Sequence, residues 1–483
     1  MNKSICDITS PEDARTFASS EDSGEKVEVK AKYLSVFAAA TMIATWNTTS
    51  TLMNFPYIFG QFGLIMGPLL TLGMQGLAFY VALHQIKLTI YYTNLGYKVD
   101  TFSDLGECLM GKKGRYIFMV VQMSNQIGFL PYALDLSVGA LQRIFYDCEF
   151  LKCNGNTMVI VIMLCYFLVQ LSRDWKNFHW LAYLVFGMTL VQAGIFASYA
   201  FLNKDKQFGS DETLLFFGQD FELPSNCTLP VLITGNNTEP PCITPDDFYT
   251  FDTFFNALGA IVFSFAPAFI LTELMSEMKH PEKEMKAALT MAFSFSSFMN
   301  EFIGLTFVLL LGNQIPMQVQ HLLPEGSVES IMSQLIILFA MILDFVISVL
   351  VINRMVVLHY FPAFDFGWTW KNAVKWGTVT FLPMTVTFAL ALLVPNFDSM
   401  ITFVTAFSIP YASYVLPSLF SLHFFSKRGV SQEVLKESRL KRVILNIAIV
   451  FAMSISIVKF YQFIINLTEL DFSGDYWCDQ VAS

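Results

Sequence analysis

The sequence predicts an all-α membrane protein with eleven transmembrane helices. The chain is 54% hydrophobic and 14% charged, and its 483 residues include 49 Phe, which is a membrane composition. Apolar stretches of about 20 residues, the length that crosses a bilayer as a helix, recur along nearly the whole chain. Two of these stretches, at corresponding places in the two halves, are interrupted by hydroxyl, glycine or proline residues.

The apolar stretches divide the chain into a short polar tail, a long membrane domain and a second short tail. Residues 1–31 are predicted to be a disordered cytosolic tail without the apolar core of a signal peptide. Residues 32–466 form the transmembrane domain, with a large extracytosolic loop at 203–250, and residues 467–483 form an extracytosolic tail. The predicted spans are 34–60, 64–90, 116–144, 155–172, 179–202, 251–276, 287–311, 329–356, 375–394, 399–425 and 443–465.

The distribution of Lys and Arg predicts the orientation of these spans. If the amino terminus is cytosolic, 22 of the 29 basic residues lie in the amino tail and inner loops, and four lie in outer loops. This bias follows the positive-inside rule. Plasma and endolysosomal membranes fit the topology equally well, and the net charge of −10 is spread over tails and loops, so no nucleic-acid partner is expected.

The long outer loop carries features of an extracytosolic segment. Asn226 and Asn236 each begin a glycosylation motif, and Cys227 and Cys242 are predicted to form a disulfide because they lie outside the reducing cytosol. The chain has eight cysteines, and five of them fall outside in this topology, so at least one outer cysteine has no partner of this kind.

The first span is interrupted near its middle by the stretch "TWNTTSTLMNFPYIFG", which begins at Thr45. The run of hydroxyl residues, followed by Asn54 and Pro56, favours unwinding of the helix. Lipid offers no hydrogen bonds to an unwound backbone, so such a segment is tolerated only where it is buried in protein or lines a wet cavity.

The sixth span has a similar interruption at Gly259, Ser264 and Pro267. Either interruption alone is typical of a packing kink. Their paired placement indicates a transporter with inverted repeats, in which spans one to five are repeated as six to ten and the substrate binds between the broken helices. Helix amino ends there favour an anionic group and carbonyls favour a cation, which suits a zwitterion.

Specific motifs at these spans carry a family resemblance. The sixth span and its inner loop read "ALGAIVFSFAPAFILTELMSEMKHPEKEMKAAL", the first span ends in "NFPYIFGQFGLIMG", and the third contains "QIGF" from Gln126. In these motifs the chain resembles the amino acid/auxin permease family, also called the transmembrane amino acid transporter family. The chain departs from the family at Thr49-Ser50-Thr51, where the family usually has Gly-small-Gly. The larger side chains of this sequence are expected to narrow the substrate pocket and to add hydroxyl groups to it.

The resemblance implies a leucine-transporter-type bundle that couples amino acid movement to protons or sodium, with no cofactor. Carried over position by position, the resemblance implies substrate contacts on both broken spans. On the first span these are Trp46, Asn47, Thr48, Thr49 and Ser50, and on the sixth span they are Val262, Phe263, Ser264, Phe265 and Ala266. In this fold the first and eighth spans form a cation site. The resemblance therefore implies ion coupling at Asp344, with Ser348 four residues on.

Charged residues at membrane depth are costly and need an explanation. A structural hydrogen bond to a neighbouring helix is the alternative role for Asp344. Glu301, midway along the seventh span, is a second candidate for ion coupling. Glu273, near the inner end of the sixth span, is a candidate for an inner gate or for a salt bridge with Arg354 or Lys279.

Other functional classes have little support in the sequence. No Gly-rich phosphate loop, no metal-spaced Cys/His set and no Ser/His/Asp arrangement is present, so neither an enzyme nor a metal site is expected. The predicted function is amino acid transport by alternating access, with proton-coupled symport favoured. Sodium-coupled symport and a non-transporting amino-acid sensor are the alternatives.

Overall fold

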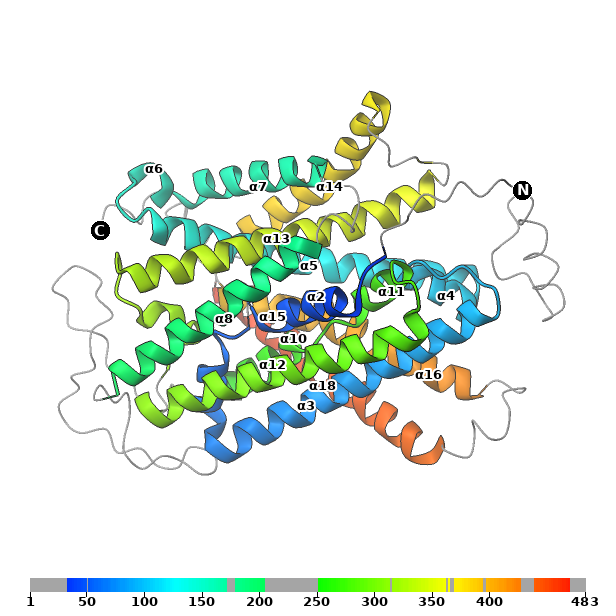
Figure 1. Ribbon diagram of the computed structural model, residues 1–483, viewed down its shortest axis with the longest axis horizontal. Helices are drawn as coiled ribbons and strands as arrows, with labels where there is room; N and C mark the ends of the chain where they lie inside the picture. Colours follow the sequence, from blue (N-terminus) through cyan, green and yellow to red (C-terminus); the bar gives the residue numbers. More distant parts are fainter. Residues whose placement is uncertain are drawn as a thin grey trace.

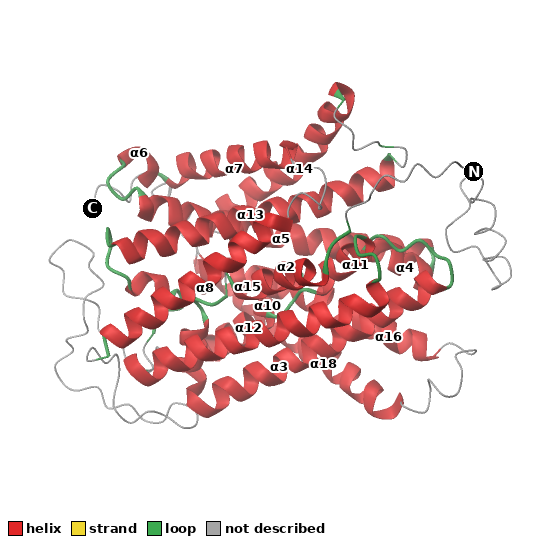
Figure 2. Ribbon diagram, viewed as in Figure 1, coloured by secondary structure: helices red, strands yellow, loops and turns green. Residues whose placement is uncertain are grey.

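The protein is all-helical, as predicted. The computed structural model describes residues 33–49, 51–171, 179–204, 251–312, 315–361, 364, 369–393, 397–426 and 438–469. Within these ranges the one β-bridge joins Leu34 to Met278. The long helices lie side by side along the longest axis of the molecule (Figure 1), and short turns join many of them (Figure 2).

The helices fall into two halves of the chain. The first half contains α2 (Val36–Thr48), α3 (Phe55–Asn94), α4 (Phe102–Met110), α5 (Lys112–Ile144), α6 (Glu149–Lys152), α7 (Asn154–Leu171) and α8 (His179–Leu202). The second half contains α10 (Phe251–Ser264), α11 (Ala268–Ser276), α12 (Pro281–Leu311), the 3₁₀-helix η2 (Val319–Leu322), α13 (Val328–Tyr360), α14 (Trp370–Leu393), α15 (Phe397–Phe407), the π-helical turn η3 (Tyr411–Val415), α16 (Leu416–Ser426) and α18 (Ser438–Glu469).

The described chain contains many helices that are able to cross a membrane. Eight are long and apolar enough, or nine if the bent pair Ile401–Phe407 and Tyr411–Phe424 is one span. All eleven predicted segments are helical, but the first, sixth and tenth consist of shorter pieces, so the number eleven stays a prediction. Gly63, with a φ of 78°, lies between the first two predicted spans and lets the chain reverse there.

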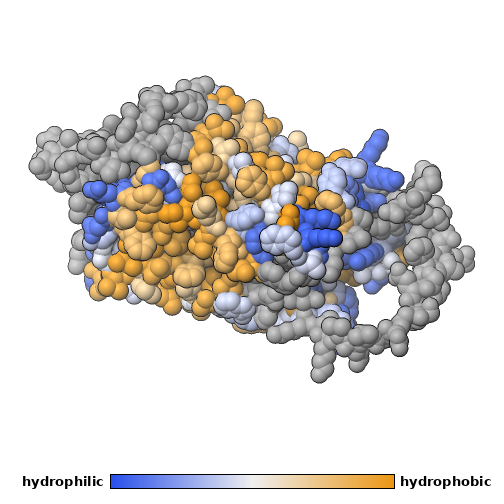
Figure 3. Space-filling model, turned by 90° about the horizontal axis from the view of Figure 1, so that it is seen from above, coloured by the Kyte–Doolittle hydropathy of each residue, from blue (hydrophilic) through white to orange (hydrophobic). Residues whose placement is uncertain are grey.

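The outer surface agrees with a membrane location. Apolar residues cover the middle of the molecule and hydrophilic residues gather towards its ends (Figure 3). Met163, Phe298 and Phe381 are each more than 60% exposed. Large apolar side chains exposed over the middle of several helices are stable in contact with lipid. The protein is therefore an integral, multi-pass membrane protein.

Helix α2 lies inside the bundle and positions the candidate site. Every residue from Ala38 to Thr49 is buried, and α2 packs mainly against α12 and α8. A helix without a polar face is stable only when its whole circumference is covered. The interruption that follows α2 is therefore enclosed by protein.

Helix α4 was not predicted by hydropathy. It is short and amphipathic, and it joins α3 to α5. Thr101 and Asp104 form a capping box at its start: the Thr101 Oγ1 accepts from the Asp104 amide at 3.2 Å, and the Asp104 Oδ2 accepts from the Thr101 amide at 2.9 Å. The Thr-x-x-Asp spacing was the local signal for this helix.

Candidate functional site

The interruption of the first span is a compact turn rather than an open loop. It joins α2 to α3, and Pro56, the second residue of α3, has no amide hydrogen that needs a partner. The Leu52 amide donates to the Thr48 carbonyl at 2.8 Å, and the Thr51 hydroxyl donates to the Asn47 carbonyl at 2.7 Å. Much of the backbone is therefore hydrogen-bonded within the turn.

Two threonines of this turn attach it to neighbouring helices. The Thr48 hydroxyl donates to the Ser296 hydroxyl on α12 at 2.9 Å, and the hydroxyls of Thr49 and Thr189 on α8 lie 2.8 Å apart. These hydroxyls therefore have structural partners, although the sequence analysis placed them against substrate. Ser50 lies outside the described residues.

The interruption of the sixth span separates α10 from α11 at Phe265, Ala266 and Pro267. Its carbonyls are held by other helices: Tyr414 donates its hydroxyl to Phe265 at 3.1 Å, and Ser413 donates to Ala266 at 3.2 Å. The Ser264 hydroxyl donates to its own helix. The sequence analysis expected carbonyls here to face a ligand, and did not identify the two donors from η3.

An aromatic chain connects the two interrupted spans. The ring of Trp46 on α2 lies 4.6 Å from that of Phe129 on α5, between ring centroids. Phe129 in turn stacks with Phe263 on α10 at 6.1 Å, and Tyr132 packs against Phe263 at 4.8 Å. The structure therefore connects Trp46 to Phe263 through Phe129 of α5, and their contact with substrate stays a prediction.

Buried amide side chains lie at the end of α2 and on the two helices that bond to the first interruption. The amide groups of Asn47, Asn300 and Gln192 are fully buried, and none of their oxygen or nitrogen atoms has a hydrogen-bond partner among the described residues. Asn300 lies one turn beyond Ser296, and Gln192 lies three residues beyond Thr189, so both share a face with a residue bonded to the turn.

Gln126 has the same property on α5. Its amide is buried without a partner in the described chain, and it lies three residues before Phe129 on one helical face. Buried amides of this kind normally bind water or a ligand. The helices that contact the broken spans thus carry buried neutral groups that can both donate and accept hydrogen bonds. The sequence analysis did not identify Asn300 or Gln192, because single amides in apolar helices give no local signal.

The predicted ion-coupling residues are only partly brought to this region. Asp344 and Ser348 are buried on one face of α13, and the Ser348 hydroxyl has no partner among the described residues. However, α13 packs mainly against α5 and α8, whereas α2 packs mainly against α12 and α8. Glu301 follows Asn300 on α12 and so points about 100° away from the face that meets the turn.

The end of the bundle that carries α4, called the α4 end here, is closed by contacts of α11. Arg354 on α13 pairs with Glu277 at 3.2 Å, and the Leu34 amide donates to the Glu277 carbonyl at 2.9 Å. Glu273 was a candidate for the pairing with Arg354, but it bonds to Gln122 instead, at 2.6 Å.

A cluster of charges lies beside this contact. On α5, Arg115 bonds to Glu107 at 2.7 Å and lies 3.5 Å from Asp104. Burial raises the pKa of the Asp104 carboxyl, while hydrogen bonds from Thr101 and the Arg115 charge act in the opposite direction. Asp104 and Glu107 are both buried, so the α4 end combines a closed contact with several titratable groups.

The opposite end, called the η2 end here, is closed by the connection between α12 and α13. The Val319 amide of η2 donates to the Met53 carbonyl in the first interruption at 3.2 Å. His321 lies two residues further on, and its burial, with the nearby Arg143 charge, lowers its pKa to about 4. It therefore stays neutral near pH 7.

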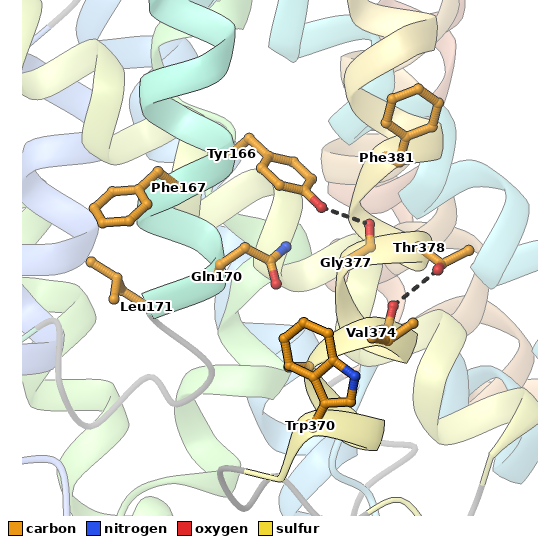
Figure 4. Close-up of a pocket in the computed structure, with 10 residues that line it drawn as sticks. Tyr166, Phe167, Gln170, Leu171, Trp370, Val374, Gly377, Thr378 and Phe381 are labelled. Carbon is orange, nitrogen blue, oxygen red and sulfur yellow. Dashed lines mark hydrogen bonds between the residues drawn. The ribbon is translucent and has the colours of Figure 1, made fainter.

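A groove of about 670 Å³ lies between α7 and α14, away from both interruptions (Figure 4). Tyr166 donates its hydroxyl to the Gly377 carbonyl across it at 3.4 Å. Its lining is mainly apolar, and Trp370 on its rim is 82% exposed. Because its chemistry is that of a lipid-facing surface, the buried amides rather than this groove mark the candidate site.

Several predicted features lie outside the described residues, namely Asn226, Asn236, Cys227 and Cys242. Cys153 is disulfide-bonded, and the other three described cysteines form no disulfide, so its partner is not among the described residues. The pairing of Cys227 with Cys242 stays a prediction. In the described ranges no cluster of three or more His, Cys, Asp or Glu side chains is arranged to hold a metal ion.

Comparison with known families decides the class of protein. The family model described as "Transmembrane amino acid transporter protein" matches residues 33–462. The chain belongs to this family. The family resemblance seen in the sequence is thereby confirmed, and this member of the transmembrane amino acid transporter family is a transporter and not an enzyme. No curated protein matches the chain.

The fold has a relative among solved structures. The chain is similar to the crystal structure of MhsT in complex with L-phenylalanine, with a TM-score of 0.50 and 12% sequence identity. The match covers 88% of this chain and 97% of that one. At this identity the likeness concerns the fold alone.

Proposed function

We propose that this member of the transmembrane amino acid transporter family is a secondary active transporter that moves amino acids by alternating access, in symport with protons. The observation that carries the proposal is the meeting of two interrupted spans around buried, uncharged amides. The neutral lining favours a zwitterion whose side chain is uncharged, because a charged side chain would remain without a partner there. The phenylalanine in the MhsT complex is a ligand of that kind.

The proposed substrate site comprises Trp46, Asn47, Thr48, Thr49 and Ser50 on the first span and Val262, Phe263, Ser264, Phe265 and Ala266 on the sixth. Asn47 supplies unused hydrogen-bonding groups, and Trp46 and Phe263 cover the substrate with their rings. The hydroxyls of Thr48 and Thr49 hold the turn in place. In the proposed eleven-span, 5+5 inverted-repeat arrangement, the two turns are related by the repeat.

Alternating access requires each end of the bundle to open in turn. Contacts of α11 with Arg354 and Leu34 close the α4 end, and the Val319 contact with Met53 closes the η2 end. The two closures use different residues, so one can break while the other remains. We propose that the α4 end faces the cytosol, which follows from the Lys and Arg distribution.

Ion coupling is assigned to Asp344, assisted by Ser348, with Glu301 as the second candidate. A buried carboxyl group that binds a proton loses its charge, and this lowers the cost of moving it through the membrane. Sodium is the alternative ion, with oxygens from Asp344 and Ser348 as ligands. Binding of sodium would require α13 to come closer to α2 than the packing shown here.

The experiment measures uptake of labelled neutral amino acids into proteoliposomes under a proton gradient, a sodium gradient or no gradient. Wild type is compared with Asp344→Asn, and Glu329→Gln on the same helix is the control because Glu329 is exposed. The expected result is proton-driven accumulation that Asp344→Asn abolishes while exchange remains. Accumulation driven by the sodium gradient would show that sodium, and not the proton, is the coupling ion. A folded protein that neither accumulates nor exchanges any amino acid would favour the alternative of a non-transporting sensor.

A further inference from the structure

A buried carboxyl group at the α4 end takes no part in the proposed substrate and ion sites. Glu273 lies on α11 and is 9% exposed. Its Oε1 accepts from the Gln122 Nε2 on α5 at 2.6 Å and from the Phe102 amide of α4 at 3.3 Å. Its Oε2 is buried without a hydrogen-bond partner in the described chain. One oxygen therefore connects three helices.

The Glu273 contact, defined as these two hydrogen bonds, is strong only when the carboxyl group is ionised. The Phe102 amide belongs to the first turn of α4, where amides lack helical partners and the helix dipole favours a negative charge. Hydrogen bonds to a carboxylate are about twice as strong as those to a neutral acid. A proton on Oε2 would weaken both bonds and find no acceptor among the described residues.

The charged groups beside the Glu273 contact have other partners. On α4, Asp104 and Glu107 are buried, and Glu107 is bonded to Arg115 of α5. Directly after α11, Glu277 is paired with Arg354. Arg115 and Arg354 are thus bonded to other carboxylates, and a charge on the buried Glu273 carries a desolvation cost.

The groups of α3 and η3 that bond near the start of α11 are neutral, and charged residues of α12 follow beyond its end. The Tyr414 hydroxyl of η3 is bonded to the Phe265 carbonyl, and the Gln85 amide of α3 donates to the Ala268 carbonyl at 2.7 Å. On α12, Glu282 and Lys283 lie in the exposed first turn. The two hydrogen bonds of the Glu273 carboxyl group are therefore what joins this part of α11 to α4 and α5.

A polar cavity provides a route for water to this region. It has a volume of about 290 Å³, and its lining includes Thr89, Thr93 and Asp100 from the α3 side and Ser276 at the end of α11. The Ser276 hydroxyl donates to the Glu273 carbonyl at 2.7 Å, one helical turn from the buried carboxyl group. The cavity therefore reaches the residue that is hydrogen-bonded to the Glu273 backbone.

We propose that Glu273 is a second proton-binding site, on the cytosolic side, whose charge controls the opening of the α4 end. When Glu273 is ionised, it holds α11 against α4 and α5. When a proton binds, α11 is released and the substrate site opens to the cytosol. This inference rests on the proposed transport function and concerns a residue distinct from the coupling carboxyl Asp344.

The test measures exchange of a labelled neutral amino acid in proteoliposomes at equal pH and equal amino acid concentration on both sides. Exchange needs opening at both ends but no ion gradient, so loss of coupling does not affect it. Wild-type exchange is expected to rise about tenfold as the pH falls from 8.5 to 6, because protonation weakens both charge-assisted hydrogen bonds of the Glu273 contact. Glu273→Gln, which cannot ionise, is expected to exchange rapidly at every pH.

Three variants separate proton binding from a structural role. Glu273→Asp keeps an ionisable group and should restore pH dependence. Gln122→Met removes one donor to the carboxylate, so protonation becomes easier and the midpoint of the pH profile should move to higher pH. Glu277→Gln breaks the neighbouring ion pair and should raise exchange while leaving the pH dependence intact.

The outcomes of this test are distinct. A Glu273→Gln protein that keeps the wild-type pH profile, or that is slow at every pH, overturns the inference, as does a wild type with no pH dependence. If Glu273→Gln fails to fold, an unmoved midpoint in Gln122→Met overturns it. Wild type that exchanges no amino acid at any pH overturns the proposed function itself, and the inference with it.

Discussion

Gly304→Ala tests whether the close approach of α12 to the first span is as tight as the structure shows. A Cβ at Gly304 would lie 2.7 Å from Cδ2 and 2.9 Å from Cε2 of Phe59. Phe59 is fully buried, and on its other side a Cβ at Gly67 would lie 3.0 Å from the same ring. The ring is therefore enclosed between two glycines and has little room to move.

The expected cost follows from this geometry. One added methyl group in a well-packed interior costs about 1 to 3 kcal/mol when neighbouring side chains cannot relax. The higher helix propensity of alanine returns about 1 kcal/mol at most. We expect a net loss of about 1 to 2 kcal/mol, measured as a lower thermal unfolding midpoint of the purified protein in detergent and as slower amino acid exchange.

Gly73→Ala on α3 is the matched control, because a Cβ there meets nothing within 4 Å. It should be neutral or slightly stabilising. Phe59→Leu should make room for the added methyl group, so the double variant should be more stable than the sum of the single effects predicts. A Gly304→Ala protein as stable as Gly73→Ala would refute the reasoning, because the contact would then not be close.

Three further predictions concern the two ends of the bundle and the first turn. Thr48→Val leaves the buried Ser296 hydroxyl without its donor and should cost about 1 to 2 kcal/mol, seen as a lower unfolding midpoint that Ser296→Ala partly offsets. Arg354→Glu should destabilise the α4 end and speed up exchange, and adding Glu277→Arg should restore the wild-type rate; a double variant no better than the single one contradicts the pairing. Burial and the Arg143 charge lower the pKa of His321 from 6.5 to about 4, so the folded protein favours the neutral imidazole. His321 therefore has no effect on the free energy of unfolding above about pH 6.5. As the pH drops from 6.5 towards 4, only the unfolded chain binds the proton, so the free energy of unfolding falls by up to about 3 kcal/mol. His321→Gln should flatten this fall in unfolding midpoints measured against pH, and an unchanged profile would show that His321 is not the group responsible.

The sequence by itself determined the class of protein and the places where its helices are interrupted. A bilayer requires long apolar segments whose backbone is satisfied internally, so both the spans and the exceptions at Asn54, Pro56 and Pro267 are visible in the chain. The pairing of the two interruptions pointed to a transporter before any contact was known. The family match confirms that assignment.

Only the tertiary structure decided which groups meet. The donors to the sixth-span carbonyls, Ser413 and Tyr414, lie nearly 150 residues away in sequence. The partner of Arg354 proved to be Glu277, one helical turn beyond the expected Glu273. Helical periodicity defines the face on which a residue lies but not the helix that covers that face, so long-range hydrogen bonds and ion pairs are set by packing of the whole bundle.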